Sequence, residues 1–230
     1  MSPEVITKIE YKWIVGILLL LIILRIIFRR RTPIKRILPL AMAMAGFSLM
    51  ASEITIIYAF QVFYGYLYYK IGLIITALMT GMAVGTWLGA KKISQIKIKS
   101  LVIIHGLIII FCLIFLLGSW LLFKTSPLPS PLIEIVFLIL AALVGGIIGF
   151  EFPIVNKLYL EQKSRLRPSG FGGQVGVIYG ADLIGSCLGA SLISIFILPI
   201  FGIFQTLILL ALLNVFVSLS LYSISKKSGI

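Results

Sequence analysis

The sequence predicts an all-helical polytopic membrane protein with seven transmembrane helices. Hydrophobic residues make up 60% of the 230 residues and charged residues 12%, with a mean hydropathy of +1.17, whereas a soluble domain carries about 25% charged residues. The apolar residues fall in blocks that approach the roughly 20 residues needed by a transmembrane helix. None of these blocks shows the strict alternation of a barrel strand, so helices are the structure that satisfies the backbone in lipid.

The apolar blocks divide the chain into an anchor and a larger membrane domain. The predicted spans are Lys12–Phe28, Ile37–Phe63, Ile71–Leu88, Leu101–Phe123, Pro131–Asn156, Gln174–Pro199 and Phe204–Ile224. The first block lacks the basic start and cleavage site of a signal peptide, and Arg29, Arg30 and Arg31 follow it directly. We therefore expect residues 1–36 to form an N-terminal anchor helix with a basic loop, and residues 37–230 to form a six-helix membrane domain.

The basic residues predict the orientation of these spans. Fifteen of the 20 lysines and arginines lie in the loops after spans one, three and five or after span seven, whereas four lie on the opposite side. Short loops rich in Lys and Arg stay on the cytoplasmic side. The N-terminus is therefore predicted to lie outside a plasma or inner membrane and the C-terminus inside. Because the net charge of +13 is spread over these loops, it does not favour nucleic-acid binding.

An internal repeat is predicted from glycines in the third and sixth spans. Three glycines recur at a constant offset of 104 residues, namely Gly72, Gly81 and Gly85 against Gly176, Gly185 and Gly189. The same offset carries the fourth span onto the seventh. Spans two to four and five to seven would then be two copies of a three-helix unit, inserted with opposite topology because three is odd. Such inverted repeats are common in secondary transporters, including each half of the major facilitator superfamily. Chance is the competing explanation, because membrane helices are rich in glycine.

The repeated glycines also predict a helix-packing face. Gly81, Gly85 and Gly89 follow one another at intervals of four, as do Gly185 and Gly189. Small residues at this spacing let two membrane helices approach closely. Tight packing is the simpler interpretation, and a sliding interface between helices that rock during transport requires the same surface.

Three acids at membrane depth are the candidate binding residues. Glu53 lies in the outer half of span two, Glu151 near the inner end of span five, and Asp182 in span six. At ~1.5 Å per residue, Glu151 and Asp182 lie at similar depths. A buried acid is unfavourable unless it is paired, hydrated or protonated. One interpretation is a rim position in which Glu151 and Asp182 pair with loop cations such as Arg165 or Arg167, or cap helix ends. The other is a net negative cavity suited to a cationic solute or to proton binding. Glu53, which is farther from any cation except Lys70, is the first candidate for such a site. Gln61 is a further candidate on the same path.

Other chemistry is not favoured by this sequence. His105 is the only histidine and is predicted to be structural, and Cys112 and Cys187 lie inside apolar blocks as small core residues. No Cys/His cluster predicts a metal site, and no nucleotide-binding loop predicts a cofactor. Glu134, near the outer end of span five, is expected to be solvated.

Long stretches of the chain resemble one known family. The segments Gly46–Gly89, Phe150–Glu161 and Gly172–Ile203 are similar to the integral-membrane region of membrane-bound spermidine synthase-like proteins. The pieces that carry this resemblance are Gly46 to Glu53, Phe60-Gln61 before Gly65-Tyr66, and Tyr179-Gly180-Ala181-Asp182 to Pro199. In that family a major-facilitator-like membrane region is fused to a soluble aminopropyltransferase domain. The resemblance covers about Leu38 to Leu213.

The chain departs from this family because it has no soluble α/β domain, so we do not expect it to be an enzyme. The inverted repeat, the acids at membrane depth and the resemblance together predict a major-facilitator-like half that acts in or alongside transport of a small cationic solute such as a polyamine. We expect a homodimer or a second membrane half to complete a transport path in the lipid bilayer. The alternative is a membrane anchor or regulatory subunit for a separately encoded aminopropyltransferase. A truncated remnant without independent function is the third possibility.

Overall fold

The computed structural model describes residues 34–65, 68–93, 98–124, 129–164 and 171–228. Within these ranges every regular element is a helix, and five helical segments are long and apolar enough to span a membrane. The expectation of a helical membrane protein is therefore confirmed. The predicted first span, Lys12–Phe28, and the loop after it to residue 33 lie outside the described residues. The rest of the chain, Ile34–Ile230, forms one compact unit.

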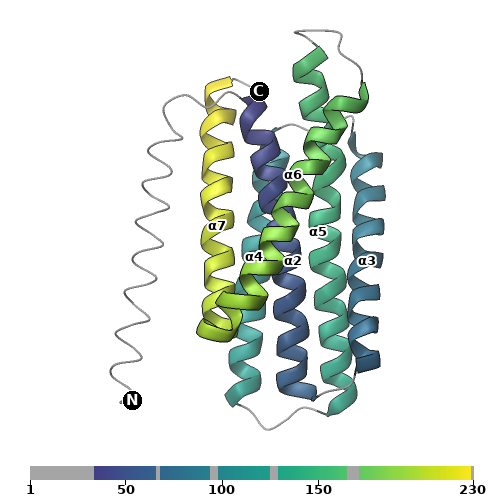
Figure 1. The fold of residues 1–230 in the computed structure, drawn as a ribbon, viewed down its shortest axis with the longest axis vertical. Coiled ribbons are helices and arrows are strands. Elements are labelled where there is room, and N and C mark those ends of the chain that lie inside the picture. Colours follow the sequence, from purple (N-terminus) through teal and green to yellow (C-terminus); the bar gives the residue numbers. More distant parts are fainter. Residues whose placement is uncertain (1–33, 66–67, 94–97, 125–128, 165–170, 229–230) are drawn as a thin grey trace, which may run out of the picture. The chain divides into compact units, whose positions relative to one another are not determined.

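Figure 1 shows the helices of this unit in chain order. They are α2 (Ile34–Tyr64), α3 (Tyr68–Lys91), α4 (Ile98–Lys124), α5 (Ser130–Ser164), α6 (Phe171–Leu192) and α7 (Leu198–Ser228), with a π-helical turn, Ile193–Ile197, between α6 and α7. The five apolar segments are Ile37–Tyr64, Tyr68–Lys91, Ile98–Lys124, Pro131–Glu161 and Val175–Ser223.

The last apolar segment is 49 residues long and contains a sharp reversal. At Gly202 the backbone has φ 79° and ψ −175°, a conformation that glycine adopts readily and side-chain-bearing residues do not. Figure 1 shows α6 running down the view and the chain turning back up along α7. Just before the reversal, the Leu198 N–H bonds the Ile193 carbonyl five residues back. This π-helical turn lies directly before Pro199. Proline has no N–H to donate, and its ring clashes with the preceding turn of a regular α-helix. The reversal lies between the predicted sixth and seventh spans.

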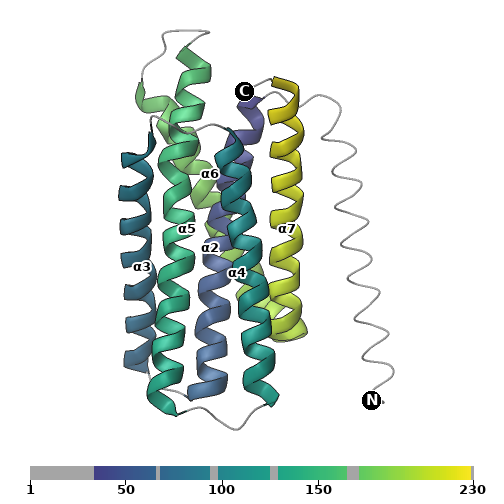
Figure 2. The same cartoon turned by 180° about the vertical axis from the view of Figure 1, so that it is seen from behind.

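Three helix pairs make up most of the packing. α3 lies along α5, α2 along α6, and α4 along α7. Helix α2 also contacts α5 and α7 and is the most enclosed of the apolar helices (Figures 1 and 2). Because α2 is surrounded by other helices, its side chains Ser48, Ser52 and Thr55 are fully buried.

Glycine sets the distance between helices in two of these pairs. Between α3 and α5, a Cβ added at Gly81 or Gly85 would overlap the carbonyl oxygen of Ala142 or Gly146. Between α2 and α6, a Cβ at Gly185 would overlap the Ala43 carbonyl oxygen, and Gly189 lies in the same way against the Phe47 backbone. Gly89 makes the next contact along α3, with Phe150 and Pro153. The backbones of these helices are therefore in direct contact.

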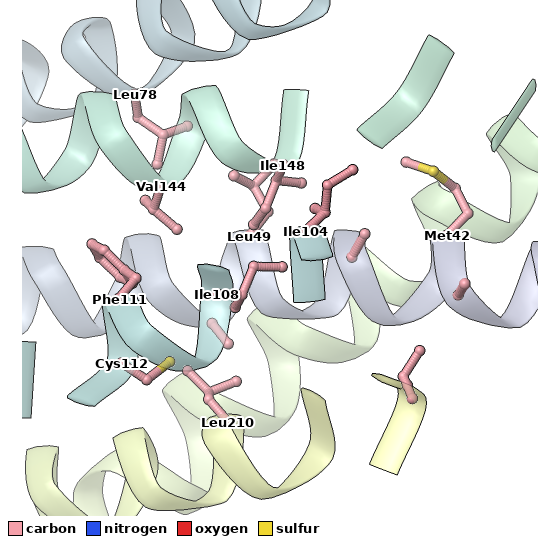
Figure 3. Packing of buried hydrophobic residues seen from close by; sticks show 14 of the residues in the cluster. Met42, Leu49, Leu78, Ile104, Ile108, Phe111, Cys112, Val144, Ile148 and Leu210 are labelled. Atoms are coloured by element: carbon pink, nitrogen blue, oxygen red, sulfur yellow. The ribbon is translucent and has the colours of Figure 1, made fainter. Parts of the chain in front are cut away.

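Buried apolar side chains fill the space between the pairs. Figure 3 shows Leu78 of α3 and Val144 of α5 directed toward Leu49 of α2, with Ile108 of α4 and Leu210 of α7 completing the cluster. All five side chains are buried. The apolar core is thus shared by helices from the whole length of the described chain.

We predict that Gly81→Ala and Gly185→Ala each lower the free energy of unfolding by about 1–3 kcal/mol, because the added methyl group overlaps a backbone carbonyl in a packed interface. Gly106→Ala is the matched control, since a Cβ at Gly106 meets open space and improves helix propensity. Thermal unfolding of the three variants in one detergent measures the difference. Equal stability of Gly81→Ala and Gly106→Ala would contradict the packing described above.

Candidate functional site

A cluster of buried polar side chains lies inside the helical unit. Ser48 and Ser52 come from α2, His105 from α4, Glu151 from α5 and Asn214 from α7, and each has 0% of its surface exposed. Two of them, His105 and Glu151, are ionisable. Polar groups are rarely buried in this way in a membrane helix unless they bind each other or a ligand.

Asn214 is the hydrogen-bonding centre of this cluster. Its Nδ2 donates to Ser48 Oγ at 2.9 Å and to the Leu210 carbonyl at 2.9 Å. Its Oδ1 lies 2.8 Å from His105 Nδ1. One amide side chain therefore connects α2, α4 and α7.

The other imidazole nitrogen faces an acid. His105 Nε2 lies 3.4 Å from Glu151 Oε1, and both side chains are fully enclosed. Neither carboxylate oxygen of Glu151 has a hydrogen-bond partner among the described residues, and the same is true of Ser52 Oγ. A buried carboxylate with one ion-pair partner and unused acceptor positions is able to bind a further donor or cation.

Buried apolar side chains lie next to the pair on the helices that carry it. Ile104 and Ile108 flank His105 on α4, Ile148 lies one turn before Glu151, and Leu210 lies one turn before Asn214 (Figure 3). These side chains are buried. A low-dielectric shell of this kind strengthens the attraction between the imidazole and the carboxylate.

Asp182 of α6 lies close to the same cluster. Its side chain is half-buried, and a Cβ added at Gly46 of α2 would come within 2.5 Å of Asp182 Oδ1 and 2.7 Å of Ser186 Oγ. The absence of a side chain at Gly46 thus leaves room for this carboxylate between α2 and α6. Glu151 is near enough to act on Asp182 electrostatically. The structure therefore brings together two of the three acids that the sequence singled out.

Glu53 and Gln61 are placed farther along α2. Both are partly buried, and Gln61 lies thirteen residues beyond Ser48, a rise of roughly 20 Å along a helix. The Gln61 carbonyl accepts from the Gly65 N–H, which closes the end of α2. Gln61 does not belong to the polar cluster, and the described contacts of the cluster do not include Glu53.

A second polar contact joins the other end of α5 to α3. Lys70 donates to Glu134 Oε2 and to the Tyr64 hydroxyl, and its ammonium lies 4.2 Å from the centre of the Tyr64 ring. Glu134 was expected to be solvated, so that expectation was wrong. The first residues of α3 and α5 meet there, and a lysine on one supplies the partner for an acid on the other.

Sequence reasoning identified Glu151 and treated its partner His105 as structural. It missed Asn214 and Ser48. A single amide in the apolar stretch that surrounds Asn214 was the available signal, because an unpaired amide is unfavourable in lipid. The rim interpretation paired Glu151 with loop arginines, but its ion-pair partner is His105; Arg165 and Arg167 lie outside the described residues.

No group of three or more metal-binding side chains is present in the part of the chain that the structure describes. No protein-family model, curated protein or solved structure matches the chain. The resemblance to membrane-bound spermidine synthase-like proteins therefore stays a prediction.

We predict that His105→Leu and Glu151→Leu are each strongly destabilising, by about 3–5 kcal/mol, because each leaves the other ionisable group buried without its partner. The double variant should be less destabilised than the sum of the two, since it removes both groups together. Thermal or denaturant unfolding of the four proteins in detergent gives the coupling. Strict additivity would mean that the two side chains do not interact.

Proposed function

We propose that this chain is a transporter-like membrane domain that binds a small cationic solute, such as a polyamine, through Glu151 and Asp182. The observation that carries the proposal is the placement of these two carboxylates, from α5 and α6, within electrostatic range of each other and away from the helix ends. Two acids that share an enclosed site attract a cation and are unfavourable without one.

The packing supports an inverted repeat of two three-helix units. If α2, α3 and α4 correspond to α5, α6 and α7, then the α3–α5 pair corresponds to the α6–α2 pair, and these are the two most extensive interfaces. The glycine contacts follow this correspondence. Gly81 and Gly85 of α3 contact Ala142 and Gly146 of α5. Gly185 and Gly189 of α6 contact Ala43 and Phe47 of α2, and these two residues precede Ala142 and Gly146 by 99 positions each. The remaining major pair, α4 with α7, corresponds to itself.

This repeat gives the proposal its mechanism. In an inverted-repeat transporter the solute site lies near the midplane, and one unit rocks against the other around it. Gly46 and Asp182 lie at the α2–α6 interface, where one unit meets the other. The proposal includes the orientation derived from the loop charges, with the N-terminus outside, seven transmembrane helices, and a homodimer or a second membrane half that completes the path.

In proteoliposomes containing the purified protein, we expect uptake of labelled putrescine or spermidine that Glu151→Gln and Asp182→Asn each reduce at least tenfold, because each removes one of the two charges that bind the ammonium groups. Glu53→Gln, on the same proposed path, should give a smaller reduction. The matched control is Glu161→Gln, since Glu161 is 60% exposed and pairs with Lys157 one turn away. Uptake that does not change in any of the site variants would refute the proposed solute site.

A second candidate function is a membrane anchor or regulatory subunit for a separately encoded aminopropyltransferase. It is favoured by the exposed lysines Lys91, Lys92 and Lys99 around one connection between helices, which would attract an acidic partner surface. Neither candidate function gives the chain an enzymatic activity of its own.

Affinity purification of the tagged protein from its native membranes tests this candidate. We expect recovery of a soluble aminopropyltransferase that is lost with Lys91→Glu, Lys92→Glu and Lys99→Glu combined, because the substitution reverses the charge of the docking surface. The combined variant should retain putrescine uptake if the two functions are separate. Absence of any such enzyme in the purified sample would exclude the anchor function.

A further inference from the structure

The acid at the centre of the proposed site is already occupied by a partner. Glu151 Oε1 faces His105 Nε2 at 3.4 Å, and both side chains are fully buried. A cationic solute that binds Glu151 must therefore either join the imidazole or replace its positive charge. The surrounding contacts distinguish these possibilities.

The hydrogen bonds of Asn214 determine which imidazole nitrogen changes its protonation. Asn214 Nδ2 donates to Ser48 Oγ and to the Leu210 carbonyl, which leaves Oδ1 as the acceptor for His105 Nδ1. Nδ1 therefore carries a proton in every charge state of the ring. The proton that is gained or lost is the one on Nε2, between the imidazole and Glu151.

The groups around the pair supply one further negative charge, that of Asp182. α2 contributes the neutral Ser48, α7 the neutral Asn214, and α6 the acid Asp182, while α3 approaches α5 through glycines. An imidazolium and a carboxylate neutralise each other. A diamine such as putrescine brings two positive charges, which the carboxylates of Glu151 and Asp182 balance. An imidazolium retained beside them would leave a net positive charge in a buried site, which is strongly unfavourable.

We infer that a protonated amine binds Glu151 in exchange for the proton on His105 Nε2, an inference that rests on the proposed function. The Nε2–H bond breaks, its electron pair stays on the nitrogen, and the proton leaves to water. The ammonium group takes the position of the imidazolium charge beside the carboxylate, so the charge of this pair is unchanged. Binding of the solute is thereby coupled to the release of one proton from His105.

The chain offers a direct test because His105 is its only histidine. We would incorporate ¹⁵N-histidine into the full chain in lipid nanodiscs and record the two imidazole nitrogens near neutral pH. Without ligand, both nitrogens should be protonated. With saturating putrescine, Nε2 should move to the resonance range of an unprotonated nitrogen while Nδ1 stays protonated. The apparent dissociation constant of putrescine should rise up to tenfold for each unit by which the pH is lowered, as the exchange of one proton requires.

Two variants and a binding measurement separate the possible results. Glu151→Gln should show a neutral imidazole before putrescine is added and no change afterwards, and Glu161→Gln should behave as the unmodified chain. Putrescine binding by equilibrium dialysis with no change at Nε2 would overturn the exchange and leave the proposed solute site standing. No putrescine binding to the folded chain would overturn the proposed site and the exchange together.

Discussion

Direct contact between helix backbones is the constraint on which the rest of this structure depends. In lipid no hydrophobic force draws two apolar helices together, so association relies on close packing and on hydrogen bonds between helices. Gly81 and Gly85 let α3 lie on the backbone of α5, and Gly185 lets α6 lie on α2. The position of α6 in turn places Asp182 beside Gly46. The glycines therefore determine where Asp182 lies as well as how the helices pack.

Burial of these polar side chains costs free energy, which the packing of the helices must offset. A carboxylate and an imidazole withdrawn from water are favourable only when they compensate each other. Glu151 and His105 do this, and Asn214 holds the imidazole by its other nitrogen while it also binds α2. Two acceptor positions on Glu151 remain unused within the described residues. Apolar residues of similar volume in place of this cluster would avoid the cost of removing charged groups from water.

The two ends of the helices differ in their polar contacts. At one end Lys70 joins Tyr64 and Glu134, tying α2, α3 and α5 together. At the other end Lys157 bonds the Ile93 carbonyl and pairs with Glu161, so it holds α5 to the segment after α3. Both contacts strengthen the α3–α5 pair, which corresponds in the proposed repeat to the α2–α6 pair. Asp182 of α6 corresponds to Leu78 of α3 at the offset of 104 residues. The α2–α6 pair therefore carries an acid where the α3–α5 pair carries an apolar side chain. This difference makes the α2–α6 interface the more polar of the two.

The sequence by itself determined that this is a helical membrane protein, because composition and block length depend on local residues alone. The spacing of Gly81 and Gly85, like the presence of Glu151 and Asp182 in apolar blocks, was also visible without a structure. The hydrogen-bond and ion-pair partners of the polar side chains were not visible in the sequence. His105 and Asn214 are 109 residues apart, and Lys70 and Glu134 are 64 residues apart, so their contacts follow from which helices are neighbours. Only the tertiary structure decided that the lone histidine faces Glu151, because that depends on the packing of α4 and α7 around α2 and α5.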